Sequence, residues 1–343
     1  MKRFILSFTA ALCLAATVFA GPHPELRFND KGRLKILQMT DLHFKDANSP
    51  DGKEFLERMD HMVAAEQPDV LIFTGDLVLP TPSKDLWKEF VAKVDSYQIP
   101  WCMVYGNHDA EHITTRAEMS AIIAKGKYSL NTLNRKGELA DVEIPVIDAK
   151  GKAGFYLYCM DSGDYNPDET VGGYASFTTA QVKWMADCCK ARKAANGSIA
   201  PAMAFFHIPL NEYIDAWTPK NGMRNSGSGE VGCGTRGEVV CTSKLNPGMF
   251  HAMREGGSII ATFCGHDHNN DFMAIYEGIV LGYGRYSGCR TTTYNDLVPG
   301  CRVIVVENNS RAFETWIHDA FDRIRDKRTF TGEKFTKEPL WKD

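Results

Sequence analysis

Several features are missing from this 343-residue chain, and each absence excludes a class of protein. Beyond the first twenty residues, no apolar run is long enough to span a bilayer, so no membrane association is expected. Basic charge is not in excess: 39 Lys and Arg face 43 Asp and Glu, and the net charge of −4 offers no general field for nucleic acid. A soluble globular protein with a small-molecule substrate fits these limits.

Cysteine pairs with the spacing of a zinc knuckle are also missing, although the chain has ten cysteines. Three cysteines in apolar, strand-like runs are predicted to be small buried hydrophobes: Cys102, Cys159 and Cys264. Disulfides are plausible for two pairs in loop-like stretches of an exported protein: Cys233 with Cys241, and Cys289 with Cys301.

The first twenty residues have the layout of a secretory signal peptide. Lys2 and Arg3 precede an apolar run over residues 4–19, and the small Ala20 ends it. This order predicts cleavage and a secreted or periplasmic protein, with an uncleaved anchor as the alternative.

From residue 34 onward, short apolar runs alternate with amphipathic stretches, which is typical of an α/β domain. Strands are predicted at 34–40, 70–74, 101–105, 155–160 and 202–206, and helices at 54–65, 84–97 and 179–194. A succession of strands, suggesting antiparallel pairing, follows at 259–264, 272–276, 279–283, 302–306 and 313–317. With no internal repeat or shift in composition, residues 21–318 are expected to form one domain, with a charged peripheral tail at 319–343. A loop at 221–237, rich in Gly, Ser and Asn, is expected to border a site.

Polar side chains directly follow five of the predicted strands. They are Asp41 and His43, then Asp76, then Asn107, His108 and Asp109, then His207, and finally His266 and His268. Because open α/β sheets bind ligands at the carboxyl ends of their strands, these residues are expected to meet at one edge. Asp41 and His43 are one residue apart, as are His266 and His268, so in extended backbone each pair would point to one face.

The residue types at these positions suit metal ions. Carboxylate, amide oxygen and imidazole without thiolate favour iron, zinc or manganese over a structural zinc site. Glycine precedes Asp76, Asn107 and His266, which would let the backbone turn sharply off each strand. Any one piece has a plainer explanation: Gly-Asp is common turn chemistry, and a lone His207 is more often a packed histidine. The ordered set favours a metal centre.

In this order, the blocks resemble those of the calcineurin-like metallophosphoesterases, over residues 34–307. The blocks are Asp-x-His, Gly-Asp, Gly-Asn-His-Asp, a lone His after a strand, and Gly-His-x-His. Within that superfamily, the chain is similar to the compact, atypical purple acid phosphatase-like proteins. This resemblance implies a β-sandwich of two mixed sheets flanked by helices, in four layers (α/β/β/α). Purple members carry Gly and Tyr where this chain has His43 and Leu79, so a non-purple variant is implied.

The resemblance also implies a pair of metal ions and their ligands. One ion would be held by Asp41, His43, Asp76 and His268, and the other by Asp76, Asn107, His207 and His266. Iron, zinc and manganese all remain open as the metals. His108 would donate a proton to the leaving oxygen, while Asp109 would either orient His108 or stabilise a turn.

The implied activity is hydrolysis of phosphate esters, with phosphomonoesters favoured, by in-line attack of a hydroxide that bridges the ions. The alternatives are a phosphodiesterase or nucleotide hydrolase of the same fold, a nuclease, which the acidic balance disfavours, and a non-catalytic metal-stabilised binding protein. Arg285 and Tyr213 are candidate substrate contacts, with Glu212 nearby; a solvated Arg285 and a packed Tyr213 are the alternatives. Surface or core roles are assigned to the remaining histidines: His23, His61, His112, His251 and His318.

Overall fold

The computed structural model describes residues 24–78, 83–111, 114–196, 199–217, 232–289 and 297–341. The predicted signal peptide, Leu79 and most of the predicted loop at 221–237 lie outside these residues. Within the described ranges, no helix combines the length and apolar character needed to cross a bilayer.

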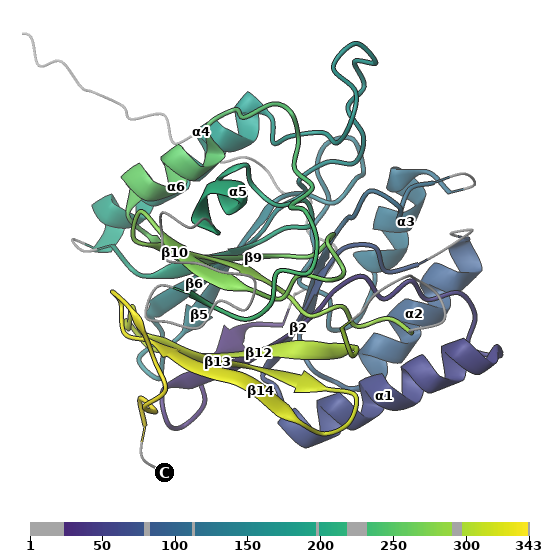
Figure 1. The fold of residues 1–343 in the computed structure, drawn as a ribbon, viewed down its shortest axis with the longest axis horizontal. Coiled ribbons are helices and arrows are strands. Elements are labelled where there is room, and N and C mark those ends of the chain that lie inside the picture. Colours follow the sequence, from purple (N-terminus) through teal and green to yellow (C-terminus); the bar gives the residue numbers. More distant parts are fainter. Residues whose placement is uncertain are drawn as a thin grey trace, which may run out of the picture.

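Two mixed β-sheets form the centre of the protein (Figure 1). The seven-stranded sheet has the order β15-β14-β13-β12-β2-β3-β4, and the eight-stranded sheet has the order β1-β5-β6-β7-β9-β11-β10-β8. The first sheet comprises β2 (Arg33–Met39), β3 (Val70–Thr74), β4 (Trp101–Val104), β12 (Gly300–Glu307), β13 (Phe313–Asp319), β14 (Ile324–Phe330) and β15 (Phe335–Thr336). The second comprises β1 (Leu26–Arg27), β5 (Val142–Ile147), β6 (Ala153–Cys159), β7 (Ala202–Phe205), β8 (Gly232–Cys233), β9 (Ile259–Cys264), β10 (Met273–Tyr276) and β11 (Ile279–Tyr283).

Parallel pairing unites the strands that carry the predicted site residues. β2, β3 and β4 run parallel in one sheet, and β6, β7 and β9 run parallel in the other. Such pairing needs crossover connections, which helices supply. The helices are α1 (Pro50–Glu66), α2 (Lys84–Ser96), α3 (Arg116–Ile123), α4 (Thr179–Asn196), α5 (Glu212–Ala216) and α6 (Met249–Gly256). Of the late strands predicted to be antiparallel, β9 and β11 instead pair in parallel.

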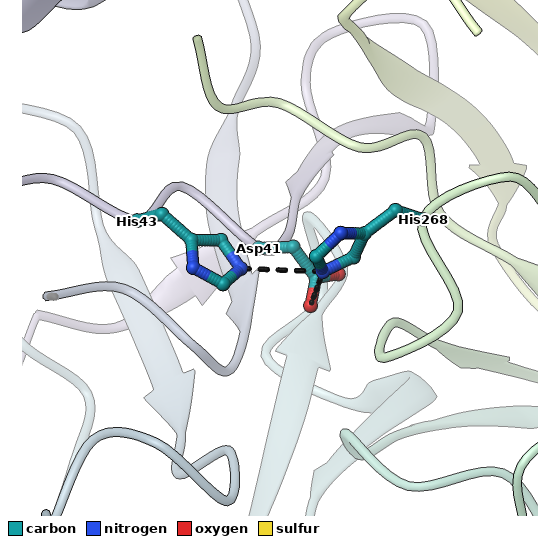
Figure 2. Close-up of side chains that lie close together, drawn as sticks. All are labelled: Asp41, His43 and His268. Atoms are coloured by element: carbon teal, nitrogen blue, oxygen red, sulfur yellow. Dashed lines mark hydrogen bonds and ion pairs between the residues drawn. The ribbon is translucent and has the colours of Figure 1, made fainter. Parts of the chain in front are cut away.

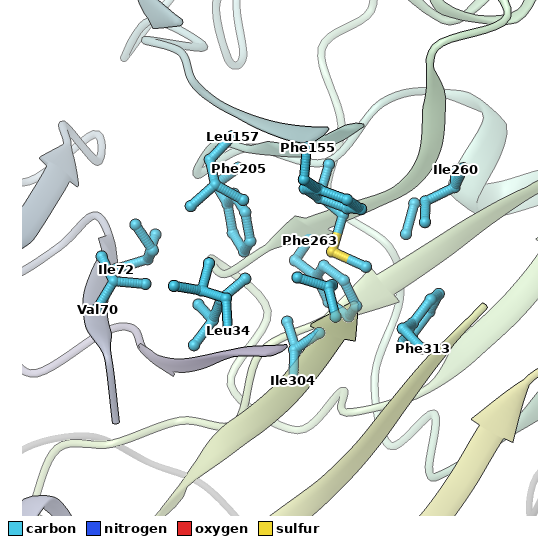
Figure 3. Packing of buried hydrophobic residues seen from close by; sticks show 14 of the residues in the cluster. Leu34, Val70, Ile72, Phe155, Leu157, Phe205, Ile260, Phe263, Ile304 and Phe313 are labelled. Carbon is cyan, nitrogen blue, oxygen red and sulfur yellow. The ribbon is translucent and has the colours of Figure 1, made fainter. Parts of the chain in front are cut away.

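The two sheets face each other across an inter-sheet core of buried apolar side chains (Figure 3). β2 contributes Leu34 and Ile36 from one sheet, and β7 and β9 contribute Phe205 and Phe263 from the other. The rings of Phe205 and Phe263 stack with centroids 5.8 Å apart, and Phe313 meets Phe263 edge-on at 6.3 Å. Burial of these side chains joins the sheets.

Helices cover the outer face of each sheet (Figure 1). Along β2, Leu37 points away from the inter-sheet core and packs in a second cluster that includes Phe55 of α1 and Trp87 of α2. On the opposite side, Met185 of α4 and Met249 of α6 pack in a third cluster over the eight-stranded sheet. The layers therefore follow the order α/β/β/α, which confirms the predicted fold class.

The helix ends are fixed by local capping. α1 begins four residues earlier than predicted, because the Ser49 hydroxyl accepts from the Gly52 amide at 3.0 Å and Pro50 occupies the first helical turn. α3 was not predicted, although Thr115 and Glu118 form a capping box at its start.

The C-terminal segment differs from the predicted peripheral tail at 319–343. β14 pairs antiparallel with β13, and β15 pairs with β14, so this segment extends the seven-stranded sheet. Most of β14 faces solvent, whereas Phe330 and Phe335 are buried in the inter-sheet core. The charged residues on which the predicted tail was based occupy exposed positions of strands near the sheet edge.

All nine cysteines within the described residues are free. The disulfides considered for Cys233 with Cys241 and for Cys289 with Cys301 are therefore not formed in this structure. Cys301 lies inside β12, and Cys289 instead donates from its thiol to the Asp51 carbonyl of α1 at 2.8 Å. The burial predicted for three other cysteines is confirmed: Cys102, Cys159 and Cys264.

Truncation of one aromatic side chain tests the role of the inter-sheet core. Phe263→Ala should lower the free energy of unfolding by about 3–5 kcal/mol, because Phe263 is fully buried between the sheets and its loss leaves a cavity. Phe321→Ala, at a position that is 61% exposed, should change it by less than about 0.5 kcal/mol. Urea unfolding measures both, and similar effects of the two changes would contradict this assignment.

Candidate metal centre

The predicted polar residues converge at the carboxyl ends of strands from both sheets. β2, β3 and β4 deliver residues from one sheet, and β7 and β9 deliver them from the other. Several contacts join the sheets here: for example, the His266 amide donates to Asp41 Oδ2 at 3.1 Å, and His207 Nδ1 lies 2.7 Å from the Thr74 carbonyl oxygen. The expectation that these side chains meet at one edge is therefore confirmed.

The sequence predicts extended backbone at this edge, but in the structure four of these residues have left-handed backbone. The φ angles are 53° at Asp41, 49° at His43, 54° at Asp76 and 79° at His266. The amides of Asp41 and His43 donate to the carbonyls of Gly75 and Asp76, each at 3.0 Å, which holds the turn after β2 against the turn after β3. Non-glycine residues rarely adopt this conformation, and each one stores about 1–3 kcal/mol of strain, typically at functional sites.

Glycines at two turns permit close approach, as predicted from their positions before Asn107 and His266. A Cβ atom added to Gly106 would lie 2.1 Å from Asp76 Oδ1, and one on Gly265 would lie 1.9 Å from Thr40 Oγ1. Larger side chains at either position would push the turn away from the buried carboxylates.

Asp41, His43 and His268 form the first group of potential ligands (Figure 2). One ligand atom from each lies within 4.8 Å of the others. His43 Nε2 is 3.2 Å from His268 Nε2, which is 3.5 Å from Asp41 Oδ1. The two imidazole nitrogens and the carboxylate thus point at one small volume.

Asp76, His207 and His266 form the second group, and their ligand atoms also lie within 4.8 Å of one another. His207 Nε2 is 3.3 Å from Asp76 Oδ2 and 3.1 Å from Asn107 Oδ1. The contact between His207 Nδ1 and the Thr74 carbonyl orients the ring so that Nε2 faces this group. Each group contains three of the four residues in one implied ligand set: Asp76 is missing from the first group, and Asn107 is missing from the second.

Burial and charge set the protonation states of the groups. Burial lowers the pKa of His43 to about 4, and burial together with His207 lowers that of His266 to about 3, so both imidazoles are neutral near pH 7. Burial opposes ionisation of Asp41 and Asp76, yet the neighbouring imidazoles hold the pKa of each carboxyl below its usual value. Burial likewise opposes protonation of His207, but the Asp76 charge raises its pKa to about 10.

The donor set fits metal ions. The ring nitrogens that face the groups are Nε2 of His43 and His268 in the first, and Nε2 of His207 and Nδ1 of His266 in the second. The facing Nε2 atoms of His43 and His268 cannot both carry protons at 3.2 Å, and a proton on His207 Nε2 compensates only Asp76. Cations between these lone pairs and the carboxylates would satisfy the atoms that point into each group.

The Asp109 carboxylate holds the backbone of the site through hydrogen bonds from amides of two turns. Its carboxylate is fully buried and accepts from four amides: Asp76 at 2.9 Å, Gly106 at 2.8 Å, Leu77 at 2.7 Å and Val78 at 3.3 Å. These contacts lock the turn after β3 to the turn after β4. Of the two predicted roles, turn stabilisation is the one with contacts in the structure.

Glu111 occupies the orienting position that had been considered for Asp109. His108 Nδ1 lies 2.9 Å from Glu111 Oε1, and the Tyr165 hydroxyl donates to the same oxygen at 3.1 Å. Tyr165 also accepts from Asn107 Nδ2 at 3.1 Å, so its hydroxyl links a potential ligand to the carboxylate that faces the predicted acid. In the sequence, the only indication of this role for Glu111 is its position three residues after His108.

Two tyrosines that were not predicted border the second group. The edge of Tyr174 meets the His266 ring with centroids 4.3 Å apart, and Tyr165 stacks on Tyr174 at 5.9 Å. Tyr165 is 44% exposed, so this aromatic pair presents a surface to solvent beside the site.

Arg285 and Tyr213 are engaged in structural contacts. Arg285 is only 4% exposed, donates from Nε to the Val298 carbonyl at 2.7 Å and forms an ion pair with Asp271, so the alternative of a solvated loop residue is wrong. Tyr213 is fully buried, with its hydroxyl 2.8 Å from Thr262 Oγ1, and is packed as its alternative stated. Nearby Glu212 accepts from Asn246 Nδ2 at 2.9 Å.

Comparison with known proteins places this geometry in a family. Residues 34–270 match the family described as calcineurin-like phosphoesterase. The chain is 29% identical to "Probable inactive purple acid phosphatase 29" of Arabidopsis thaliana, over 90% of this chain and 85% of that protein. It is 28% identical to "Phosphatase DCR2" of Saccharomyces cerevisiae, over 74% of this chain and 48% of that protein. The fold is also similar to a dimetal phosphatase from Danio rerio, with 10% identity, a TM-score of 0.52 and coverage of 88% of this chain and 99% of that chain.

The contrast between Asp109 and Glu111 can be tested by stability measurements on metal-free protein. Asp109→Ala should lower the free energy of unfolding by more than about 2 kcal/mol, because four buried amides lose their acceptor. Glu111→Ala, at a partly exposed carboxylate, should lower it by less than about 1 kcal/mol. Equal losses in urea unfolding would show that Asp109 does not hold the turns.

Proposed function

The chain belongs to the calcineurin-like phosphoesterase family, and on that basis we propose that it hydrolyses phosphate esters, with phosphomonoesters as preferred substrates. The observation that carries this proposal is the convergence of two ligand groups beside His108. The His43 and His108 rings lie 6.2 Å apart, which is close enough for one phosphoryl group to reach both.

Two ions drawn from iron, zinc and manganese are proposed as cofactors. Asp41, His43 and His268 would hold one ion, His207, His266 and Asn107 the other, and Asp76 would be shared. When bound, such ions lower the pKa of a water for in-line attack and neutralise charge on the phosphoryl oxygens. The neutral state of His43 and His266 leaves ring nitrogens free to act as ligands.

His108 is proposed to protonate the leaving oxygen. Its Nδ1 faces Glu111, so the proton for the substrate would leave from Nε2. The Glu111 carboxylate lies against this side of the ring, and the Tyr165 hydroxyl donates to Glu111 in turn.

The word inactive in the Arabidopsis name applies to that relative alone. In this chain every predicted ligand is present, and the two carboxylates among them, Asp41 and Asp76, are buried beside the imidazoles. This arrangement supports an active enzyme. We also propose that residues 1–20 act as a signal peptide for export and that the substrate is a small phosphate ester. A chain that binds metal but turns over no phosphate ester would favour the non-catalytic alternative.

Metal removal and two substitutions test the proposed activity. Hydrolysis of an aryl phosphate monoester should be lost with chelator and restored by added zinc, iron or manganese. Asp76→Asn should reduce both metal content and activity to near background, since it removes the shared ligand. His108→Ala should retain bound metal and lower kcat by about 10²- to 10⁴-fold. Full activity of Asp76→Asn would overturn the two-metal assignment.

Glu111 is proposed as a positioning residue, and a kinetic comparison tests it. Glu111→Gln should lower kcat by about 10-fold with little change in KM, because the amide keeps the shape but not the charge beside His108. In the His108→Ala background the same change should have no further effect on kcat. An equal loss in both backgrounds would show that Glu111 does not act through His108.

A further inference from the structure

A second kind of histidine cluster lies outside the candidate metal centre and shares no residue with it. His61 of α1, His318 of β13 and Asp322 of the β13–β14 turn each place one ligand atom within 4.8 Å of the others. Asp322 Oδ1 is 3.1 Å from His318 Nε2 and is also hydrogen-bonded to His61 Nε2. Segments more than 250 residues apart in the chain therefore meet through these three side chains.

Buried Glu66 orients the innermost of these histidines. His318 Nδ1 lies 2.8 Å from Glu66 Oε1, which also accepts from Trp316 Nε1 at 3.0 Å. Lys35 Nζ is 3.6 Å from the other Glu66 oxygen, so both oxygens of this carboxylate have partners. The contact with Glu66 fixes the His318 ring with Nε2 turned toward Asp322. This carboxylate–histidine pairing is the arrangement that surrounds metal-bound imidazoles.

Asp322 places a second carboxylate beside the same imidazole. His318 lies between two carboxylates, with Nδ1 2.8 Å from Glu66 Oε1 and Nε2 3.1 Å from Asp322 Oδ1. His61 supplies a second imidazole at the Asp322 oxygen, and a metal ion uses two imidazoles and a carboxylate that converge in this way.

We propose that His61, His318 and Asp322 bind a third divalent metal ion, with zinc as the best match. Two imidazoles and one carboxylate without thiolate suit zinc and its neighbours in the first transition row, and not the hard ions calcium and magnesium. Exposure of His61 and Asp322, at 55% and 62%, leaves room for a water in the fourth position. The site borders a cavity of about 370 Å³ lined by Arg58, Val298 and Phe321.

A metal ion at this site would link two segments that are distant in the sequence. Zinc bound here would tie α1, which covers the outer face of the seven-stranded sheet, to the turn that begins β14. Asp319 prepares that turn, since its buried carboxylate accepts from the Phe321 amide at 2.9 Å and from Arg323 Nε at 2.9 Å. Binding would therefore stabilise the C-terminal strands against separation from the helix.

Zinc stoichiometry on the full chain tests this proposal. After loading with zinc and dialysis, the parent protein should hold three ions per chain and His61→Ala should hold two. His251→Ala removes an exposed histidine of α6 and should leave three. His61→Ala should weaken zinc binding at this site by at least about 10-fold, since loss of a direct ligand exceeds loss of an outer partner. Phosphatase activity should be unchanged in both variants.

An Asp76→Asn background separates this site from the proposed catalytic metals. In that background, added zinc should still raise Tm, and the rise should disappear with His61→Ala or Asp322→Asn but not with His251→Ala. If the catalytic pair of ions were absent, the parent and His61→Ala would hold one and zero ions, so the difference of one would remain. Equal zinc content and equal Tm shifts in the parent and His61→Ala would overturn the third site.

Discussion

Two carboxylates, Asp41 and Asp76, are buried where the two sheets meet, and the surrounding structure is organised to stabilise their charge. Burial of an unpaired carboxylate is strongly unfavourable, so compensation must come from nearby donors and cations. Asp76 Oδ1 accepts from the His108 amide at 2.9 Å, and Asp41 accepts from the His266 amide. Each carboxylate is therefore stabilised by the turn of a different strand. Removing its charge would loosen several turns at once.

Much of this arrangement follows from short-range patterns in the sequence. β3 has the predicted bounds, and β2 differs from its predicted range by one residue at each end, because apolar runs followed by Gly or Thr and a carboxylate mark where a buried strand stops. Parallel pairing then brings the strand ends together, so the residues that follow them meet without further information. The sequence did not predict the local conformation. Asp41 and His43 converge through left-handed turns and not through extended backbone.

Other parts depend on partners that no local pattern identifies. Glu111 and Tyr165 become relevant only because the turn after β4 and the segment after β6 lie together. Arg285 reads as a solvated loop residue until its buried partner Asp271 is known. The charged C-terminal strands illustrate the same limit, since their two buried phenylalanines find the core only after β12 and β13 are in place. Long-range packing overrides local composition in each case.

The left-handed turn at His43 places a ligand in a conformation that glycine adopts without strain. Glycine could form the same turn, so the turn itself does not require histidine. Random substitution under selection for stability alone would favour glycine at position 43, whereas glycine at Asp41 or Asp76 would also remove a hydrogen-bond acceptor from the turns. Backbone strain and metal binding therefore make opposite demands on the side chain at this one position.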